Sequence, residues 1–346
     1  MNRLRELLKK HWRRAFGQTI AVQVINILVL FIALFVALKV LSWAVIFAVG
    51  PWQNPQLCQG ANGACWPFLT EKLPLILFGT FPYEERWRAL VVSFGLLIMS
   101  AVTLFQWFSW RWQAIGWLLG MGLFAVLMGG GVIGLPTVTT ARWNGLPVLL
   151  FLGTTSLAAA LPVGLLFALG RQSKSPVWHW LSIIVIETLR GIPMVAVLFF
   201  GVFVLPLVVG AFKLSAFYAA LTVLVFFHAA YVAEDLRSGL QSISKGQWEA
   251  CQTMGLSHWQ TLRLVVLPQA LKAATPALTN TAIGGFKDTS LIVLVGLHDM
   301  VSTARMAFSD VNWQAQALEA YVFVGLVFFV LNGVISLAGR RLEKIL

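Results

Sequence analysis

Long apolar segments separated by short polar stretches fill this chain of 346 residues. Eight of the segments approach or exceed the roughly 20 residues that a helix needs to cross a bilayer. They cover residues 20–49, 90–105, 115–135, 146–169, 194–209, 216–233, 276–295 and 317–339. This pattern predicts an all-α integral membrane protein with about eight transmembrane helices.

Two further apolar runs are too short to span. Residues 73–81 are expected to lie at the membrane interface or within a loop, and residues 177–189 are expected to form an elbow at the cytoplasmic face. Counting 177–189 as a span would move most of the later basic residues outside, against the positive-inside rule. With the elbow, 17 of the 25 Lys and Arg residues face the cytoplasm, 6 lie outside, and Lys39 and Lys287 lie within spans. Both termini are then predicted to be cytoplasmic.

Composition agrees with a membrane protein and argues against a nucleic-acid partner. Hydrophobic residues make up 59% of the chain and charged residues only 11%, which is outside the range of soluble globular domains. The net charge of +12 has a simpler cause than nucleic-acid binding, because basic residues collect in cytoplasmic loops.

A polar stretch, residues 244–268, interrupts the apolar pattern and predicts two short helices at a sharp corner. Ser244 with Gln247, and Ser257 with Gln260, have the spacing of capping boxes. Gly255 lies between them, where a helix ends in the left-handed conformation. The first helix is expected to present Trp248, Cys251 and Gly255 on one side, with Glu249 beside them.

The second helix of this corner is expected to place Trp259, Leu262 and Val265 or Val266 at helical spacing until Pro268 interrupts it. Two helices joined at a glycine are also typical of a helix-turn-helix that reads DNA. A loop tethered closely to membrane spans favours a cytoplasmic docking element instead.

The same stretch resembles the EAA loop of ABC importer permeases, whose pattern is Glu-Ala-Ala, Gly, nine residues, then Ile-x-Leu-Pro. The matching positions are Glu249-Ala250-Cys251, Gly255 and Val265-Val266-Leu267-Pro268. Cys251 replaces the second alanine and Val265 replaces isoleucine. The resemblance is closest to the polar amino-acid branch and extends from about residue 146 to residue 346. It implies a five-helix type I permease core at 146–346 with a coupling loop at 234–272, preceded by an N-terminal extension, 1–145, with three spans and an external loop.

This resemblance implies a multi-pass subunit in a bacterial inner membrane. Its partners would be ATP-binding subunits, a second permease chain or copy, an extracytoplasmic solute-binding protein, an amino-acid substrate and membrane lipid. The chain has no P-loop, so ATP and Mg²⁺ are expected in the partner and no enzyme activity in this chain. The residues expected to couple to the ATPase are Gln247, Trp248, Glu249, Ala250, Cys251, Gly255, Leu256 and Pro268.

Two charged groups of residues near the bilayer are candidates for a translocation path or gate. Lys287-Asp288-Thr289-Ser290 resembles a run in amino-acid permeases, and it forms either part of the path or an internal ion pair. Glu187-Thr-Leu-Arg190-Gly191-Ile192-Pro193 is similar to the family's Glu-x-x-Arg-Gly-Thr-Pro, with Ile192 in place of threonine. Arg190 is expected to pair with Glu187, and Gly191 and Pro193 to form a bend, either static or moving with a gate.

The other chemistry-bearing residues are interpreted conservatively. His228, Glu234 and Asp235 are taken as ordinary helix-end polarity, and the histidines and cysteines lack the spacing of a metal site. Cys58 and Cys65 lie in the expected external loop, where either a disulfide or two free thiols are consistent with the sequence. An ion-coupled secondary transporter is the alternative function; Lys287 and Asp288 favour it, but it leaves the polar corner without a role.

Overall fold

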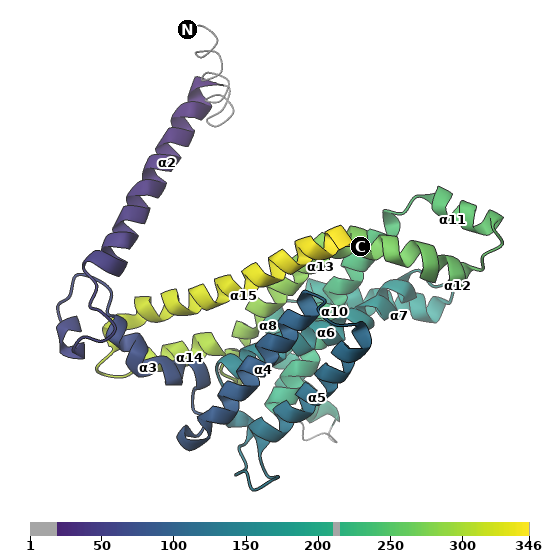
Figure 1. The fold of residues 1–346 in the computed structure, drawn as a ribbon. Coiled ribbons are helices and arrows are strands. Elements are labelled where there is room, and N and C mark those ends of the chain that lie inside the picture. The colour runs from purple at the N-terminus through teal and green to yellow at the C-terminus, as the bar shows by residue number, and fades with distance from the viewer. Residues whose placement is uncertain (1–18, 210–214, 346) are drawn as a thin grey trace. The chain divides into compact units, whose positions relative to one another are not determined.

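The computed structural model describes residues 19–209 and 215–345 (Figure 1). Within these ranges the chain is helical, with turns and two isolated β-bridges in place of any sheet. Some of the basic residues counted above lie outside the described residues. They are the N-terminal ones between Arg3 and Arg14, predicted to be cytoplasmic, and Lys213, predicted to lie outside the cell. The chain divides into two compact units, 1–72 and 73–346.

The first unit contains helix α2 (Ile20–Leu41) and a loop that folds back on itself. The Thr19 hydroxyl accepts a hydrogen bond from the first turn of α2. Apolar side chains lie on every side of α2, with Gln23, Asn26 and Lys39 as its polar residues, and this distribution suits a helix surrounded by lipid. Further along, the N–H of Val49 donates to the carbonyl of Ala64 at 2.8 Å, and the N–H of Trp66 donates to the carbonyl of Val49 at 3.2 Å. These bonds close the base of the loop.

Helices α4 (Arg86–Leu104) and α5 (Trp110–Gly129) follow α3 (Trp66–Phe78) and pack side by side. The third apolar segment was expected to remain helical to residue 135, but α5 ends at its glycines. Gly130 and Gly131 have φ angles of +68° and +79°, which end the helix in the way that glycine permits and other residues resist.

The second unit is built around α6 (Leu146–Arg171) and α10 (Ala216–Gln241), which pack along much of their length. Helix α13 (Leu267–Asp288) packs on α10, and α15 (Ala317–Ile345) packs on α13. Between α13 and α15 lie the 3-10 helix Thr289–Val295, the short α14 (Met300–Phe308) and the 3-10 turn Gln314–Gln316.

An aromatic cluster joins α5 to α6 and α10. The rings of Phe124 and Phe151 stack at 3.8 Å between centroids, and those of Trp143 and Phe217 meet edge-on at 5.0 Å. The last span of the expected N-terminal extension therefore shares a hydrophobic core with the helices that follow residue 146.

The expected elbow is a helix of its own, α7 (Pro176–Gly191). It is bent by 112° from the helical stretch 194–208, which consists of α8 (Met194–Phe199), a π-helical turn and the beginning of α9 (Leu205–Val209). Ile192, at the bend, is extended, and Pro193 starts α8 with a fixed φ.

Six helices of the described residues are long and apolar enough to cross a membrane, and seven if the bent pair at α7 and α8 counts as one span. The count of eight was therefore approximate. The segment expected at 276–295 is not among them, because α13 ends at Asp288 and carries several polar residues along its length. The six spans are Ile20–Ile46, Tyr83–Leu104, Arg111–Gly129, Leu146–Arg171, Ala216–Gln241 and Gln314–Ile345.

The polar corner consists of α11 (Lys245–Thr253) and α12 (His258–Thr261). A π-helical turn, Leu262–Val266, connects α12 directly to α13, so the helix is continuous from His258 to Asp288. Pro268 was expected to interrupt it, and this was wrong. The N–H of Leu267 bonds to the carbonyl of Leu262, five residues earlier. This wider turn makes room for the ring of Pro268, which in a regular helix would clash with the carbonyl four residues before it.

Candidate functional site

The turn at the end of α11 fixes the angle of the polar corner. Gly255 has a φ of +76°, its N–H donates to the carbonyl of Gln252 at 2.9 Å, and the N–H of Leu256 donates to the carbonyl of Cys251 at 3.1 Å. This pair of bonds is a Schellman motif, which satisfies the last carbonyls of the helix. The left-handed glycine predicted from the sequence is confirmed.

Of the two predicted capping boxes, one forms. The hydroxyl of Ser257 accepts the N–H of Gln260 at 3.3 Å, and the side chain of Gln260 accepts the N–H of Ser257 at 2.8 Å. Ser244 is the N-cap of α11, but its side chain makes no capping bond. The reciprocal bond is absent because the amide oxygen of Gln247 instead accepts from Gln269 on α13, at 3.4 Å.

The corner has an inner and an outer face. Cys251 is 5% exposed, and the half-buried Trp248 packs on the apolar cluster that includes Leu262 and stacks on His258 at 5.2 Å. Trp248 is therefore part of the internal packing of the corner. Glu249, with Gln247, Ala250 and Met254, is exposed on the outer face.

Glu234 is the centre of an ion-pair network at the end of α10. Its carboxylate lies 3.3 Å from Arg171 of α6 and 3.7 Å from Arg190 of α7, and it also binds Arg237 one turn further along α10. Arg171 in turn lies 3.0 Å from Glu187. One carboxylate thus joins three helices.

This network corrects two sequence-based interpretations. The carboxylate beside Arg190 is Glu234 rather than Glu187, which pairs with Arg171 instead. Glu234 was interpreted as ordinary helix-end polarity because its partners on α6 and α7 are distant in the sequence. Its three-residue spacing from Arg237 was the one local signal.

A second polar contact lies inside the helix bundle. His228 is 2% exposed; its Nδ1 lies 3.3 Å from the hydroxyl of Ser156 and its Nε2 lies 3.5 Å from the carboxylate of Asp288. The contact therefore connects α6, α10 and α13. A histidine within the apolar run 219–233 was the signal that the sequence analysis did not use.

The run that begins at Lys287 divides between the interior and the outer surface of the chain. Asp288 faces His228, and the fully buried Thr289 donates its hydroxyl to the carbonyl of Phe286 at 2.7 Å, whereas Lys287 is exposed and Ser290 is half-buried. The side chain that lies beside the Asp288 carboxylate inside the bundle is His228, and not the neighbouring Lys287.

Residues 160–345 match a protein family described as "Binding-protein-dependent transport system inner membrane component". The chain belongs to this family. The match covers the helices that carry the polar corner, the Glu234 network and the contact of His228 with Asp288.

Several curated proteins resemble this transport component. The inner membrane amino-acid ABC transporter permease protein YhdY of Escherichia coli (strain K12) is 38% identical over 88% of this chain and 83% of its own length. The glutamate/glutamine/aspartate/asparagine transport system permease protein BztC of Rhodobacter capsulatus is 30% identical over 82% of this chain and 79% of its own. The glutamine transport system permease protein GlnP of E. coli K12 is 32% identical over 59% of this chain and 95% of its own.

A solved structure agrees with the fold of this transport component. The crystal structure of an amino acid ABC transporter with histidines superposes with a TM-score of 0.52 at 27% identity, covering 59% of this chain and 92% of the other.

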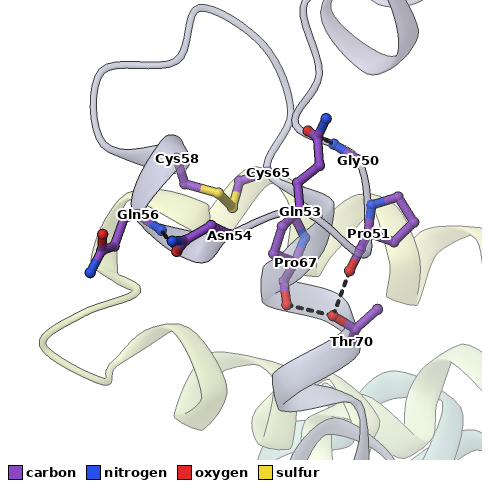
Figure 2. Close-up of a disulfide and its surroundings, with 9 residues drawn as sticks. All are labelled: Gly50, Pro51, Gln53, Asn54, Gln56, Cys58, Cys65, Pro67 and Thr70. Carbon is purple, nitrogen blue, oxygen red and sulfur yellow. Dashed lines mark hydrogen bonds between the residues drawn. A yellow bond between two sulfur atoms is a disulfide. The ribbon is translucent and has the colours of Figure 1, made fainter.

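Within the first unit of this transport component, Cys58 and Cys65 form a disulfide (Figure 2). The amide oxygen of Asn54 accepts the N–H of Gln56 at 3.0 Å beside it, and the hydroxyl of Thr70 donates to the carbonyl of Pro51 at 3.1 Å. The described residues hold no group of three or more His, Cys, Asp or Glu side chains arranged to bind a metal ion.

Proposed function

We propose that this chain is the permease subunit of a binding-protein-dependent ABC importer for polar amino acids, and that its polar corner docks on a cytoplasmic ATP-binding subunit. The observation that carries the proposal is the outer face of α11, where Glu249 is exposed on a helix whose other face is held by Trp248 and Cys251. The names of the curated relatives support an amino-acid substrate.

The remaining partners follow from this assignment. A second permease chain or copy completes the pore, a solute-binding protein delivers the amino acid from outside, and ATP and Mg²⁺ bind the ATPase partner. Both termini lie in the cytoplasm of a bacterial cell, beneath the inner membrane. Residues 146–346 form the core, and 1–145 form the extension. The family match over residues 160–345 and the near-complete coverage of GlnP by 59% of this chain support that division.

Helix α13 is proposed to line the translocation path. It packs against α10 and α15. The exposed residues Gln269, Lys272, Pro276 and Asn280 follow one another at three- or four-residue spacing along one side, and the exposed Lys287 lies seven residues, about two turns, beyond Asn280. Polar side chains at membrane depth are costly unless they meet water or another protein. The bend at Gly191 and Pro193 is proposed as the hinge of the gate, anchored through Arg190 to Glu234.

The native cysteines allow a direct test of this path. Cys251 is buried and the other two are bonded to each other, so an added cysteine can be labelled selectively. An Asn280→Cys variant should react with a membrane-impermeant thiol reagent, and a Leu326→Cys variant, exposed on α15, should not. Equal labelling of the two variants would contradict the proposal.

The docking proposal is tested by reversing one charge. A Glu249→Arg variant should fail to co-purify with the ATP-binding subunit, or should uncouple ATP hydrolysis from amino-acid uptake in proteoliposomes. Glu84→Arg, the same change at an exposed position ahead of α4, is the matched control and should behave like the unchanged protein.

Energy coupling separates this importer from an ion-coupled transporter. Uptake should require ATP inside the proteoliposomes and persist when a protonophore is added. Uptake that collapses with the protonophore and survives loss of the ATPase would overturn the proposed function.

A further inference from the structure

An apolar cavity of about 370 Å³ lies between α4 and α5. Met99 and Val102 of α4 line one side, Trp112 and Gly116 of α5 line the other, and Phe108 from the connecting turn also lines the cavity. This volume lies within the range of sites that bind small molecules.

The polar groups in the wall of the cavity are already engaged. The indole N–H of Trp117 donates to the hydroxyl of Thr103 at 2.8 Å, and that hydroxyl donates to the carbonyl of Met99 at 2.9 Å. The side-chain amide of Gln113 donates to the carbonyl of Phe108 at 2.6 Å. The cavity therefore presents apolar surface, which suits a hydrocarbon chain better than a polar solute.

The cavity lies where two candidate spans end. The turn between α4 and α5 carries Trp107, which is 62% exposed, and the first turn of α5 carries Trp112, which is 67% exposed. Exposed tryptophans at helix ends are typical of the membrane–water interface. A hydrocarbon chain entering here therefore belongs to a molecule whose polar end lies at that interface.

Positive charge surrounds the same end of these helices. The guanidinium of Arg341, near the end of α15, lies 5.8 Å from the ring centroid of Phe105, two residues beyond Thr103 in the cavity wall. Arg340 is also exposed on α15, and Arg111 lies in the first turn of α5. Such a group of arginines attracts an anionic headgroup.

We propose that this cavity binds an acyl chain of an anionic phospholipid, with the lipid phosphate held by Arg341 and Arg111. A neutral lipid would fill the cavity but gain nothing from the positive charge beside it, and a soluble anion would bind beside the arginines but leave the cavity empty. A phospholipid with net negative charge matches both features.

The test counts lipids that remain bound to the full chain. The purified protein is equilibrated in detergent with equal amounts of phosphatidylglycerol and phosphatidylcholine of identical acyl chains, repurified, and analysed by mass spectrometry. Phosphatidylglycerol should be enriched about fivefold for each arginine that contacts it. Soluble glycerol phosphate, added as a competitor, should displace none of it.

Two matched pairs of variants locate the site. Gly116→Phe fills the cavity, and Gly122→Phe adds the same side chain on the same helix outside it; a Cβ atom at either glycine has open space. Arg341→Gln removes one charge beside the cavity, and Lys174→Gln removes one after α6. Gly116→Phe should retain about one phosphatidylglycerol fewer per chain than the unchanged protein. In Arg341→Gln the enrichment of phosphatidylglycerol over phosphatidylcholine should fall about fivefold, and both control variants should match the unchanged protein.

Three results would overturn the proposal. They are equal lipid retention in the two phenylalanine variants, equal enrichment in the two glutamine variants, and displacement of the lipid by glycerol phosphate. The elution volume in gel filtration verifies that each variant is folded.

Discussion

The carboxylate of Asp288 lies 3.5 Å from Nε2 of His228, at the point where α13 crosses α10. The same imidazole reaches Ser156 on α6 through its other nitrogen. A single buried ring therefore holds three helices of the bundle in register.

Removing this ring should destabilise the bundle. His228→Leu removes the hydrogen bond with the buried Ser156 and the imidazole beside Asp288, and we expect a loss of about 1–3 kcal/mol, since a buried polar group left without its partner costs about that much. Ser156→Ala removes one contact and should cost about 1 kcal/mol. The midpoint of thermal unfolding in detergent measures the loss in each variant. Equal midpoints for His228→Leu and Ser156→Ala would show that the contact with Asp288 contributes nothing to stability.

Two adjacent glycines on α13 should differ in their tolerance of a methyl group. A Cβ on Gly285 would lie 2.9 Å from Leu157 and 3.1 Å from His228, whereas one on Gly284 has open space. Overpacking typically costs about 1–3 kcal/mol, so Gly285→Ala should lower the unfolding midpoint. Gly284→Ala is the control and should leave the midpoint unchanged or raise it. A lower midpoint for Gly284→Ala than for Gly285→Ala would show that His228 does not pack against Gly285.

Neutralising Glu234 should affect stability more than neutralising Glu187. Glu234 contacts three arginines and is 22% exposed, whereas Glu187 contacts one and is 55% exposed. Glu234→Gln removes the carboxylate that Arg171, Arg190 and Arg237 share and leaves the pair of Glu187 with Arg171 in place, at an expected cost of about 1–3 kcal/mol. Glu187→Gln should cost less than about 1 kcal/mol. Thermal unfolding at low and high salt measures the loss of stability in the two variants. Equal losses in Glu234→Gln and Glu187→Gln would mean that the network does not hold the helices together.

The corner depends on the backbone of Gly255. Gly255→Ala meets no neighbouring atom, so its expected cost of about 1–2 kcal/mol comes from the left-handed φ alone. Hydrogen exchange of residues 245–258 should accelerate in this variant and change less in Gly255→Asn, because asparagine tolerates this conformation better. Gly246→Ala, inside α11, is the control. Identical exchange in Gly255→Ala and the unchanged protein would show that the turn has another conformation.

The three cysteines should react differently with an alkylating reagent. Cys251 is buried, and Cys58 and Cys65 are bonded to each other. Denatured without reductant, the chain should incorporate one alkyl group per molecule; after reduction it should incorporate three. Mass spectrometry of the intact protein provides the count, and three groups without reductant would rule out the disulfide.

The sequence predicted those features that local patterns determine. The apolar segments predicted the first residues of α2, α6, α10 and α15, although the segment 276–295 began nine residues after the start of α13. Gly255 ended α11 as its left-handed preference requires, and the elbow at α7 followed from its length and from the positive-inside rule.

The errors arose where distant contacts decide the outcome. Arg190 lies beside Glu234, 44 positions later in the chain, rather than beside Glu187, and Gln247 bonds to Gln269 rather than capping its own helix. Neither of these partners can be predicted from neighbouring residues in the sequence, because each comes into contact only when the helices pack. Pro268 misled for a related reason: a rule about regular helices does not anticipate a π-helical turn just ahead of it.

That turn, Leu262–Val266, has a consequence for the geometry of the whole bundle. A π turn closes its hydrogen bond five residues back instead of four, so it takes up one additional residue within a single turn. Deleting one residue inside the turn should therefore restore a regular helix and leave Asp288 facing His228. Deleting one residue from α13 after the turn would instead rotate the rest of that helix by about 100° and turn Asp288 away.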